Sequence, residues 1–198
     1  MHRWYVHPAT HVLVVATPLP TGAPYGNTRP YLSRGWCYLE MRMSALVKRR
    51  NLLWDMRNFA EAVAEGGDSE YKTLKEGMNA GRLPPMSPDR VASEMRKSVA
   101  SGTLSFSHAA DEDVVLDMYR RGFEEAFRAA DRPDGEIYYN KLEWGDAEAE
   151  LLAEAIEYMR AHGCVPAARL LMGQNDISEV GKERLHAVML AAGMEPAF

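Results

Sequence analysis

The chain has 198 residues, of which 46% are hydrophobic and 26% are charged, and its formal net charge is -5. These values are typical of a globular protein with a sizeable core. No apolar run approaches the length of a membrane span, so a membrane partner is not expected. The five-residue apolar run near the N-terminus is also too short for a secretory signal peptide.

The charges are distributed unevenly along the chain. Residues 1–60 hold eight Lys and Arg against two Asp and Glu, whereas residues 61–198 hold fifteen against twenty-six. The basic end indicates either an anionic partner, such as a nucleotide, or simple packing against the acidic part. The basic residues do not alternate with aromatic residues along a stripe, so we expect no nucleic-acid partner. The two cysteines, Cys37 and Cys164, are far apart, which favours a reduced, cytoplasmic setting.

The N-terminal part has the pattern of a strand, a loop and a helix. Residues 1–10 are expected to be irregular, and the valine-rich run of residues 11–17 predicts a buried strand. A loop rich in Pro and Gly follows, and a helix is predicted over residues 35–50, with the basic residues 48–50 at the negative end of its dipole. Residues 51–56 predict a second short strand. The pattern predicts half of a βαβ unit, whose loop is the usual place for a ligand.

Helices dominate the middle of the chain. Residues 71–80 predict a short helix, and a stronger one begins at Pro88 with Ser87 as its N-cap. A further helix is predicted over residues 111–130. Its inward-facing residues are expected to be Val114, Val115, Met118, Phe123 and Phe127.

The last third of the chain has the pattern of an internal repeat with two copies. In each copy a short strand leads to an asparagine, Asn140 or Asn175, and then to a helix over residues 146–160 or 178–192. The two helices have matching apolar stripes, formed by Leu151, Leu152, Ala155 and Ile156 and by Val180, Leu185, Val188 and Met189. Residues 137–192 resemble leucine-rich repeats of the ribonuclease-inhibitor type. The resemblance implies that Asn175 binds backbone groups inside the bend of the repeat.

The loop after the first strand carries a pattern of unusual residues. Residues 31–40 read Tyr-x-Ser-x-x-Trp-Cys-x-x-Glu, with Tyr31, Ser33, Trp36, Cys37 and Glu40 at the specified positions. Residues 11–50 therefore resemble part of a Toll/interleukin-1 receptor-type (TIR) domain. In members of that family that hydrolyse NAD, the Glu of this motif is catalytic. The resemblance implies that Glu40 stabilises the positive charge that develops as the glycosidic bond breaks.

Each of these residues also has a purely structural interpretation. Glu40 gains stability near a helix N-terminus without catalysis, and Trp36 suits a core anchor as well as a ligand platform. Cys37 is either a thiol whose pKa Arg34 lowers or a small core residue. Arg34 is suited to binding phosphate or carboxylate, or an acidic side chain of the C-terminal part.

We therefore expect a helix-rich α/β protein in three parts. These are a partial TIR-like unit with a partial parallel sheet over residues 1–60, a helical segment over 61–134, and a strand–helix repeat pair over 135–198. The histidines lack metal-ligand spacing, and no phosphate-binding glycine motif occurs, so neither metal nor cofactor is expected.

The leading functional hypothesis is a signalling or protein-interaction module within a larger architecture, which binds protein partners or a second copy of itself. In TIR domains an earlier strand and the loop after it complete the nucleotide pocket. No such strand and loop stand before residues 11–17 here, so we expect the catalytic pocket to be incomplete. The alternatives are an NAD-consuming glycohydrolase that uses Glu40, with NAD as its substrate, and a truncated remnant without activity of its own.

Overall fold

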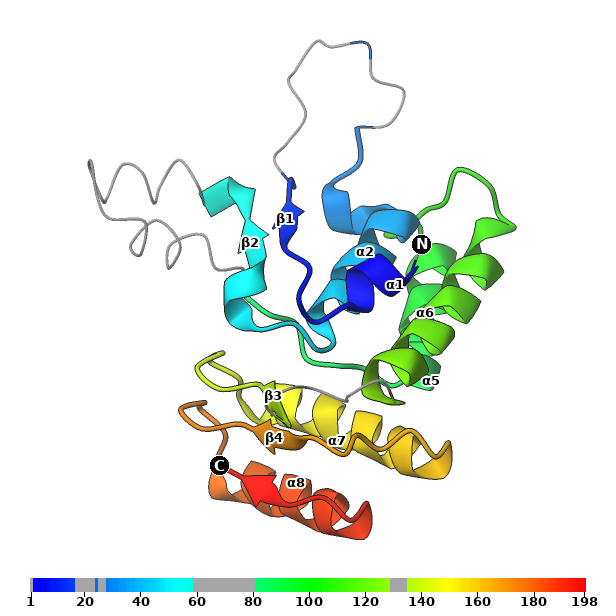
Figure 1. The fold of residues 1–198 in the computed structure, drawn as a ribbon. Helices are drawn as coiled ribbons and strands as arrows, with labels where there is room; N and C mark the ends of the chain where they lie inside the picture. The colour runs from blue at the N-terminus through cyan, green and yellow to red at the C-terminus, as the bar shows by residue number, and fades with distance from the viewer. Residues whose placement is uncertain (1, 17–23, 25–27, 59–80, 129–134) are drawn as a thin grey trace, which may run out of the picture.

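The computed structural model describes residues 2–16, 24, 28–58, 81–128 and 135–198 (Figure 1). Its elements form a mixed α/β arrangement with short parallel strands. The short helix predicted over residues 71–80 lies outside the described residues. The N-terminal elements and the helical pair α5 and α6 lie together in Figure 1, and the strands and helices of the C-terminal part stack below them.

The N-terminal part is a small βαβ unit. Strands β1 (Val12–Val14) and β2 (Leu53–Asp55) pair in parallel, with Val12 opposite Leu53. Helix α2 (Gly35–Ala45) connects them. Three single turns of 3-10 helix flank these elements: η1 (Tyr31–Ser33) before α2, η2 (Arg50–Leu52) before β2, and η3 (Met56–Asn58) after β2. A helical crossover is what parallel pairing requires. Both predicted strands are therefore present, although each is shorter than expected. The expectation that the first strand is buried is wrong in part, because Val14 is buried but Leu13 is 55% exposed.

Two expectations for this part are wrong. Residues 1–10 are not wholly irregular, because His2–Val6 form helix α1, whose Val6 enters the core. The helix predicted to reach Arg50 ends at Ala45, so the basic residues 48–50 do not occupy its last turn. Lys48 is instead buried, and its Nζ donates a hydrogen bond to the carbonyl of His7.

Helices α5 (Pro88–Ala100) and α6 (Asp111–Arg128) pack against each other in the middle of the chain. The predicted N-cap is present, because Ser87 Oγ accepts a hydrogen bond of 3.2 Å from the Arg90 N–H. The inward face of α6 contains Val115, Tyr119, Gly122, Phe123, Ala126 and Phe127. Val114 is 49% exposed, so its predicted inward position is wrong. One residue advances a helix by about 100°, which turns Val114 away from the face on which Val115 lies.

The C-terminal part alternates strands and helices. Strands β3 (Glu136–Tyr138), β4 (Arg169–Leu171) and β5 (Pro196–Ala197) form a parallel sheet in that order. Helices α7 (Asp146–Ala161) and α8 (Glu179–Ala191) connect them and pack against each other. Leu185, Val188 and Met189 are buried as predicted, but Val180 is 74% exposed and lies outside the apolar stripe.

The asparagines of the two predicted copies, Asn140 and Asn175, are not equivalent. Ile137 pairs with Leu170, an offset of 33 residues, and the ladder continues with a hydrogen bond of 3.1 Å from the Lys141 N–H to the Gly173 carbonyl. Asn140 therefore lies opposite Gly173, and Leu142 is the counterpart of Asn175. The sequence comparison placed the copies two residues out of register because it aligned the asparagines and not the strands.

Asn175 ties the two strand–helix units together. Its Oδ1 accepts hydrogen bonds from the N–H groups of Leu142 (2.9 Å) and Trp144 (3.4 Å). Its Nδ2 donates to the carbonyls of Tyr139 (2.7 Å) and Met172 (2.8 Å). One side chain thus satisfies backbone groups that the turn after each strand leaves without a ladder partner.

Arg82 joins the N-terminal and C-terminal parts. Its guanidinium is buried and donates hydrogen bonds to the carbonyls of Ala45 (2.7 Å) and Leu46 (2.9 Å) at the end of α2. It also donates to the carbonyl of Tyr138 in β3 (2.6 Å) and lies over the ring of Tyr139. A cation at this place satisfies helix carbonyls that lack intrahelical partners. One buried apolar cluster accordingly extends from Val6 to Met194.

Candidate functional site

The carboxylate of Glu40 is held by two tyrosine hydroxyls. Tyr5 of α1 donates a hydrogen bond of 2.7 Å to Oε1, and Tyr31 of η1 donates a longer one of 3.5 Å to Oε2. Glu40 lies five residues after the first residue of α2, beyond the first turn, where a helix dipole acts most strongly on an acid. Its structural partners are therefore the hydroxyls and not the helix terminus.

The same contacts keep the tyrosines protonated. Burial, and then the hydrogen bond to Glu40, raise the pKa of Tyr5 to about 12. Burial and the charge of Glu40 also raise the pKa of Tyr31 well above its usual range. Both hydroxyls therefore remain hydrogen-bond donors at neutral pH, and each oxygen of the Glu40 carboxylate has a donor.

A cavity of about 390 Å³ opens beside the beginning of α2. The described residues that line it come from the loop before α2, from its first turn and from the connection between α5 and α6: Arg29, Arg34, Gly35, Trp36, Cys37, Ser105, Phe106 and Ser107. The structure thus brings Arg34, Trp36 and Cys37 of the predicted site together. Glu40, Tyr31 and Ser33 are not part of this lining.

Backbone hydrogen bonds fix the two walls of this cavity. The Gly35 N–H donates to the Ser105 carbonyl (2.9 Å), and the Ser105 N–H donates to the Ser33 carbonyl (3.1 Å). Ser33 therefore contributes through its backbone. The Phe106 ring lies directly against Gly35, where a Cβ atom would come within 1.9 Å of it. Sequence reasoning missed residues 105–107 because they are distant in the chain and carry no recognisable motif.

The two arginines of the cavity are held by backbone carbonyls. Arg34 Nε donates a hydrogen bond of 2.8 Å to the carbonyl of Arg29, and Arg29 Nη1 donates one of 3.2 Å to the carbonyl of Gly102. No acidic side chain is among the described residues that line the cavity. The neighbouring Asp111 is hydrogen-bonded to Trp36, whose Nε1 lies 3.0 Å from Asp111 Oδ2.

Trp36 and Cys37 fit the structural interpretations better than the chemical ones. Trp36 packs against the buried core, and its bond to Asp111 joins α2 to α6. Burial, together with the charge of Glu40, raises the pKa of the Cys37 thiol although Arg34 acts in the opposite direction. Arg34 thus does act to lower the pKa of this thiol, but burial and Glu40 outweigh it, so the net pKa is raised. A raised pKa disfavours the reactive thiolate at neutral pH.

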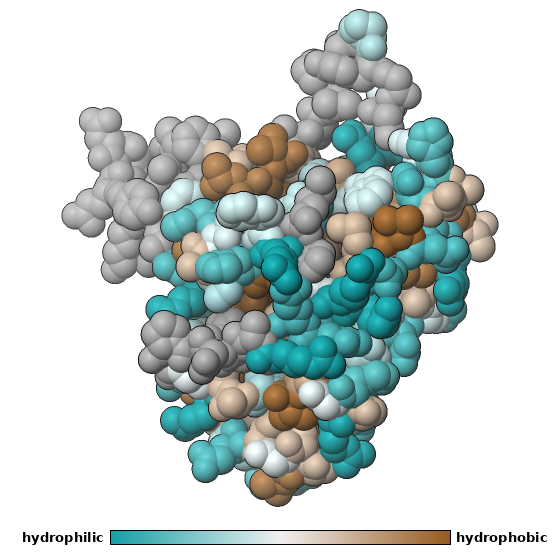
Figure 2. All heavy atoms as spheres, turned by 45° about the vertical axis from the view of Figure 1, so that its right-hand side comes forward, coloured by the Kyte–Doolittle hydropathy of each residue, from teal (hydrophilic) through white to brown (hydrophobic). Residues whose placement is uncertain are grey.

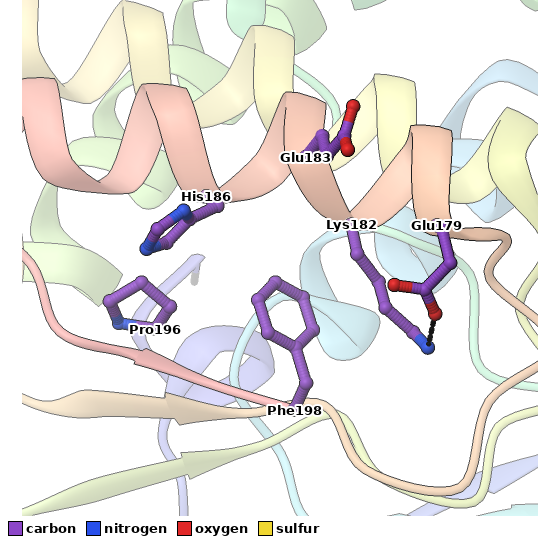
Figure 3. Close-up of a pocket in the computed structure, with 6 residues that line it drawn as sticks. All are labelled: Glu179, Lys182, Glu183, His186, Pro196 and Phe198. Atoms are coloured by element: carbon purple, nitrogen blue, oxygen red, sulfur yellow. Dashed lines mark hydrogen bonds and ion pairs between the residues drawn. The ribbon is translucent and has the colours of Figure 1, made fainter.

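A second cavity, of about 400 Å³, lies between α8 and β5 at the outer end of the C-terminal sheet (Figure 3). It is lined by Glu179, Lys182, Glu183, His186, Pro196 and Phe198. Lys182 forms an ion pair of 2.6 Å with Glu179, so its charge is compensated within the cavity itself. The mixed charges here favour no single class of ligand.

Within the described ranges, no helix is long and apolar enough to cross a bilayer. No group of three His, Cys, Asp or Glu side chains in the same ranges is arranged to hold a metal ion. Comparison of the chain with protein-family models, with curated proteins and with solved structures gave no significant match. The candidate site therefore consists of two groups of residues around α2: Glu40 with its two tyrosines, and the cavity at the first turn of the helix.

Proposed function

We propose that this chain is a signalling or protein-interaction module, with a TIR-like N-terminal unit and C-terminal units of the leucine-rich-repeat type. The observation that carries the proposal is the separation of Glu40 from the cavity. The expected catalytic carboxylate is bound by Tyr5 and Tyr31, whereas Arg34, Trp36 and Cys37 line a different space. Because Glu40 lies outside both cavities that the described residues are shown to line, it is poorly placed to stabilise a transition state in either of them.

The C-terminal sheet supports a role in protein contacts. Its strands and helices repeat with an offset of 33 residues between β3 and β4, and Asn175 binds the backbone of both units. Stacked strand–helix units present an extended surface for partners. On the face that Figure 2 turns forward, hydrophilic side chains predominate and apolar ones form small separate groups. Such a face suits polar, reversible contacts.

The intracellular setting of this proposal is supported by the two cysteines. Cys37 and Cys164 are both free thiols, as is usual in a reducing compartment. The partners we propose are other proteins or a second copy of the chain. Sedimentation velocity over a range of protein concentrations distinguishes self-association from a requirement for another protein.

Incubation with NAD tests the proposal against the glycohydrolase alternative. We expect no release of nicotinamide by the folded protein at high NAD concentration, measured by chromatography over many hours. Release of nicotinamide that disappears in a folded Glu40→Ala variant would overturn the proposal and establish the enzyme. An Arg96→Gln variant, changed on the exposed side of α5, is the matched control for Glu40→Ala.

Thermal unfolding tests whether the chain is instead a remnant without a stable fold. Because one buried cluster joins residues from Val6 to Met194, we expect a single cooperative transition. Calorimetry would show this as agreement between the calorimetric and van't Hoff enthalpies. A broad transition without cooperativity would support the remnant.

A further inference from the structure

A largely apolar stripe is exposed along the outer side of helix α8. Val180 and Leu190 are 74% and 58% exposed, and Ala187 is exposed between them. Together with the exposed Glu183, these residues follow one another at steps of three, four and three positions, which places them on one face of the helix. This is the heptad spacing of a helix that packs lengthwise against another helix. We call these four residues the outer stripe of α8.

The other side of α8 is already used within the chain. Leu185 and Met189 are buried there, and Arg184 forms ion pairs with Glu150 (3.1 Å) and Glu157 (2.8 Å) of α7. In Figure 1, α8 and β5 lie at the end of the molecule opposite the N-terminal elements, and no described element lies beyond them. Figure 2 shows a group of apolar side chains at the same lower end. Exposed apolar side chains that share one face are typical of an interaction surface.

The neighbouring edge of the sheet is a poor place for a further strand. β5 is the last strand in the order of the C-terminal sheet, and the first of its two residues is Pro196. Proline has no N–H group, so this short edge lacks one of the few donors that strand pairing needs. Contact at this end of the molecule is therefore expected through the helix.

The outer stripe is complementary to itself when two copies of α8 run antiparallel. The pair Val180 and Leu190 and the pair Glu183 and Ala187 have the same midpoint, at residue 185. A two-fold axis at this midpoint places each Val180 against Leu190 of the second copy. It also places each Glu183 beside the small Ala187 of the second copy. A symmetric contact between identical surfaces requires this reciprocal matching.

The charges also favour the antiparallel arrangement. Neither Glu183 nor the exposed His186 has a hydrogen bond or ion pair in the described part of the chain. The two-fold axis brings His186 to the level of Glu183 of the second copy, where an imidazole N–H can donate to the carboxylate. In a parallel arrangement each Glu183 would instead meet Glu183 of the second copy, and like charges repel.

We propose that two copies of this chain associate through the outer stripe of α8, with their α8 helices antiparallel. The inference rests on the interaction-module proposal and names a second copy as the partner. Helix α8 has 13 residues and is about 20 Å long, so its contact is smaller than a standard interface. We therefore expect weak association, with a Kd between about 10 μM and about 1 mM.

Sedimentation equilibrium of the full chain tests the association. Between about 10 μM and about 1 mM protein, we expect the average mass to rise from that of a monomer toward that of a dimer. A constant monomer mass would overturn this inference alone, because the NAD experiment tests the module proposal separately. Growth beyond the dimer would also overturn it, because a two-fold contact is closed.

A matched pair of variants tests the surface. Leu190→Glu is expected to raise the Kd by about 10-fold or more, because it places two acids in the apolar part of each contact. The control is Val114→Glu on α6, where the native side chain is 49% exposed and outside the stripe, and its Kd should change by less than about 2-fold. Undiminished association of Leu190→Glu, or equal losses in both variants, would overturn the assignment.

Glu183→Leu tests the same surface in the opposite direction. It replaces the one charged residue of the outer stripe with an apolar one, so we expect the Kd to fall by about 10-fold or more. An unchanged or raised Kd would contradict the position of residue 183 in the contact. Circular dichroism spectra establish that each variant is folded.

Oxidative cross-linking tests the orientation of the helices. A mixture of Val180→Cys and Leu190→Cys proteins should form a disulfide-linked mixed dimer, because the two positions face each other. Either protein alone should not, because equivalent positions would lie about 15 Å apart along the helix axis, beyond the reach of a disulfide. The wild type, with Cys37 and Cys164, gives the background. Cross-linking of Val180→Cys with itself above that background would contradict the antiparallel arrangement.

Discussion

The hydroxyl of Tyr5 in α1 donates a hydrogen bond of 2.7 Å to Oε1 of Glu40 in α2. This contact fixes the carboxylate that the sequence resemblance to TIR domains implies to be catalytic, and it links α1 to α2. Tyr31 adds a longer bond to the other oxygen. The two bonds differ enough in length for their contributions to be separated by mutation.

Tyr5→Phe should destabilise the protein more than Tyr31→Phe. We expect Tyr5→Phe to lower the free energy of unfolding by about 1–2 kcal/mol, because it removes a hydrogen bond to a charged, partly buried group. Tyr31→Phe should have a smaller effect because its oxygen lies 3.5 Å from Oε2. Urea unfolding measures the free energy of unfolding of both variants and of the wild type. Equal losses would contradict the relative strengths that the geometry implies.

The raised pKa of Tyr5 predicts a loss of stability in alkali. In the unfolded chain the pKa of Tyr5 returns to its ordinary value of 10.0, whereas in the folded protein it is about 12. The contribution of the protonated hydroxyl is therefore fully present below pH 10 and disappears as the pH rises through the folded pKa near 12. Urea unfolding between these pH values should show a steeper decline for the wild type than for Tyr5→Phe. Parallel declines would contradict the prediction.

Gly35→Ala should disturb the wall of the cavity. The added Cβ would come within 1.9 Å of the Phe106 ring, so the ring must move, at about 1–3 kcal/mol of stability. The double variant with Phe106→Ala should lose less than the sum of the two single variants, which a double-mutant cycle measures. Gly81→Ala is a suitable control, because among the described residues no atom other than those of its chain neighbours lies within 4 Å of the position of its added Cβ. Additive losses would mean that Phe106 does not confine residue 35.

Arg82→Met should loosen the connection between α2 and β3. It removes the guanidinium donors of the carbonyls of Ala45, Leu46 and Tyr138, although the Leu46 carbonyl keeps the hydrogen bond from the Tyr139 hydroxyl. We expect a loss of about 3 kcal/mol or more in unfolding free energy, because three hydrogen bonds from a buried charged group are lost together. Arg169→Met, at a side chain that is 54% exposed, should have little effect. Hydrogen exchange should locate the change at the end of α2 and in β3, and an unchanged exchange pattern would contradict the role of Arg82.

Asn175→Asp should destabilise the C-terminal part, whereas Asn140→Asp should not. The substitution at Asn175 replaces the donor to the carbonyls of Tyr139 and Met172 with a negative oxygen, with an expected loss of about 2–4 kcal/mol. Asn140 lies opposite Gly173, outside this network. Chemical unfolding of the two variants tests the difference. Similar losses would indicate that the asparagines are equivalent after all.

The elements with strong local signals could be predicted from the sequence. The valines at positions 12, 14 and 15 indicate the strand β1 because they are β-branched and belong to an uninterrupted apolar run. Pro88 after Ser87 marks the first turn of α5 because both residues suit a helix N-terminus. Arg34, Trp36 and Cys37 could be recognised as neighbours because a single loop and helix turn carries them. These features depend on residues close in the chain.

The features that were missed depend on contacts between distant residues. Nothing near Arg82 indicates that its guanidinium reaches the end of α2, and nothing near Ser105 indicates that it forms the second wall of the cavity. The end of α2 was misplaced because the basic residues 48–50 continue a helical pattern, while Arg82 supplies the cation that the last turn needs. Tertiary contacts of this kind override a local pattern.

The bond from Arg82 to the end of α2 has a practical consequence for dissecting the protein. A fragment that stops near residue 60 contains the whole βαβ unit. It lacks the Arg82 guanidinium, which donates hydrogen bonds to the last carbonyls of the connecting helix α2. Such a fragment would expose the carbonyls of Ala45 and Leu46 to solvent and would unfold more readily than the same residues in the full-length chain. Expression of the N-terminal unit by itself therefore requires a boundary beyond Arg82.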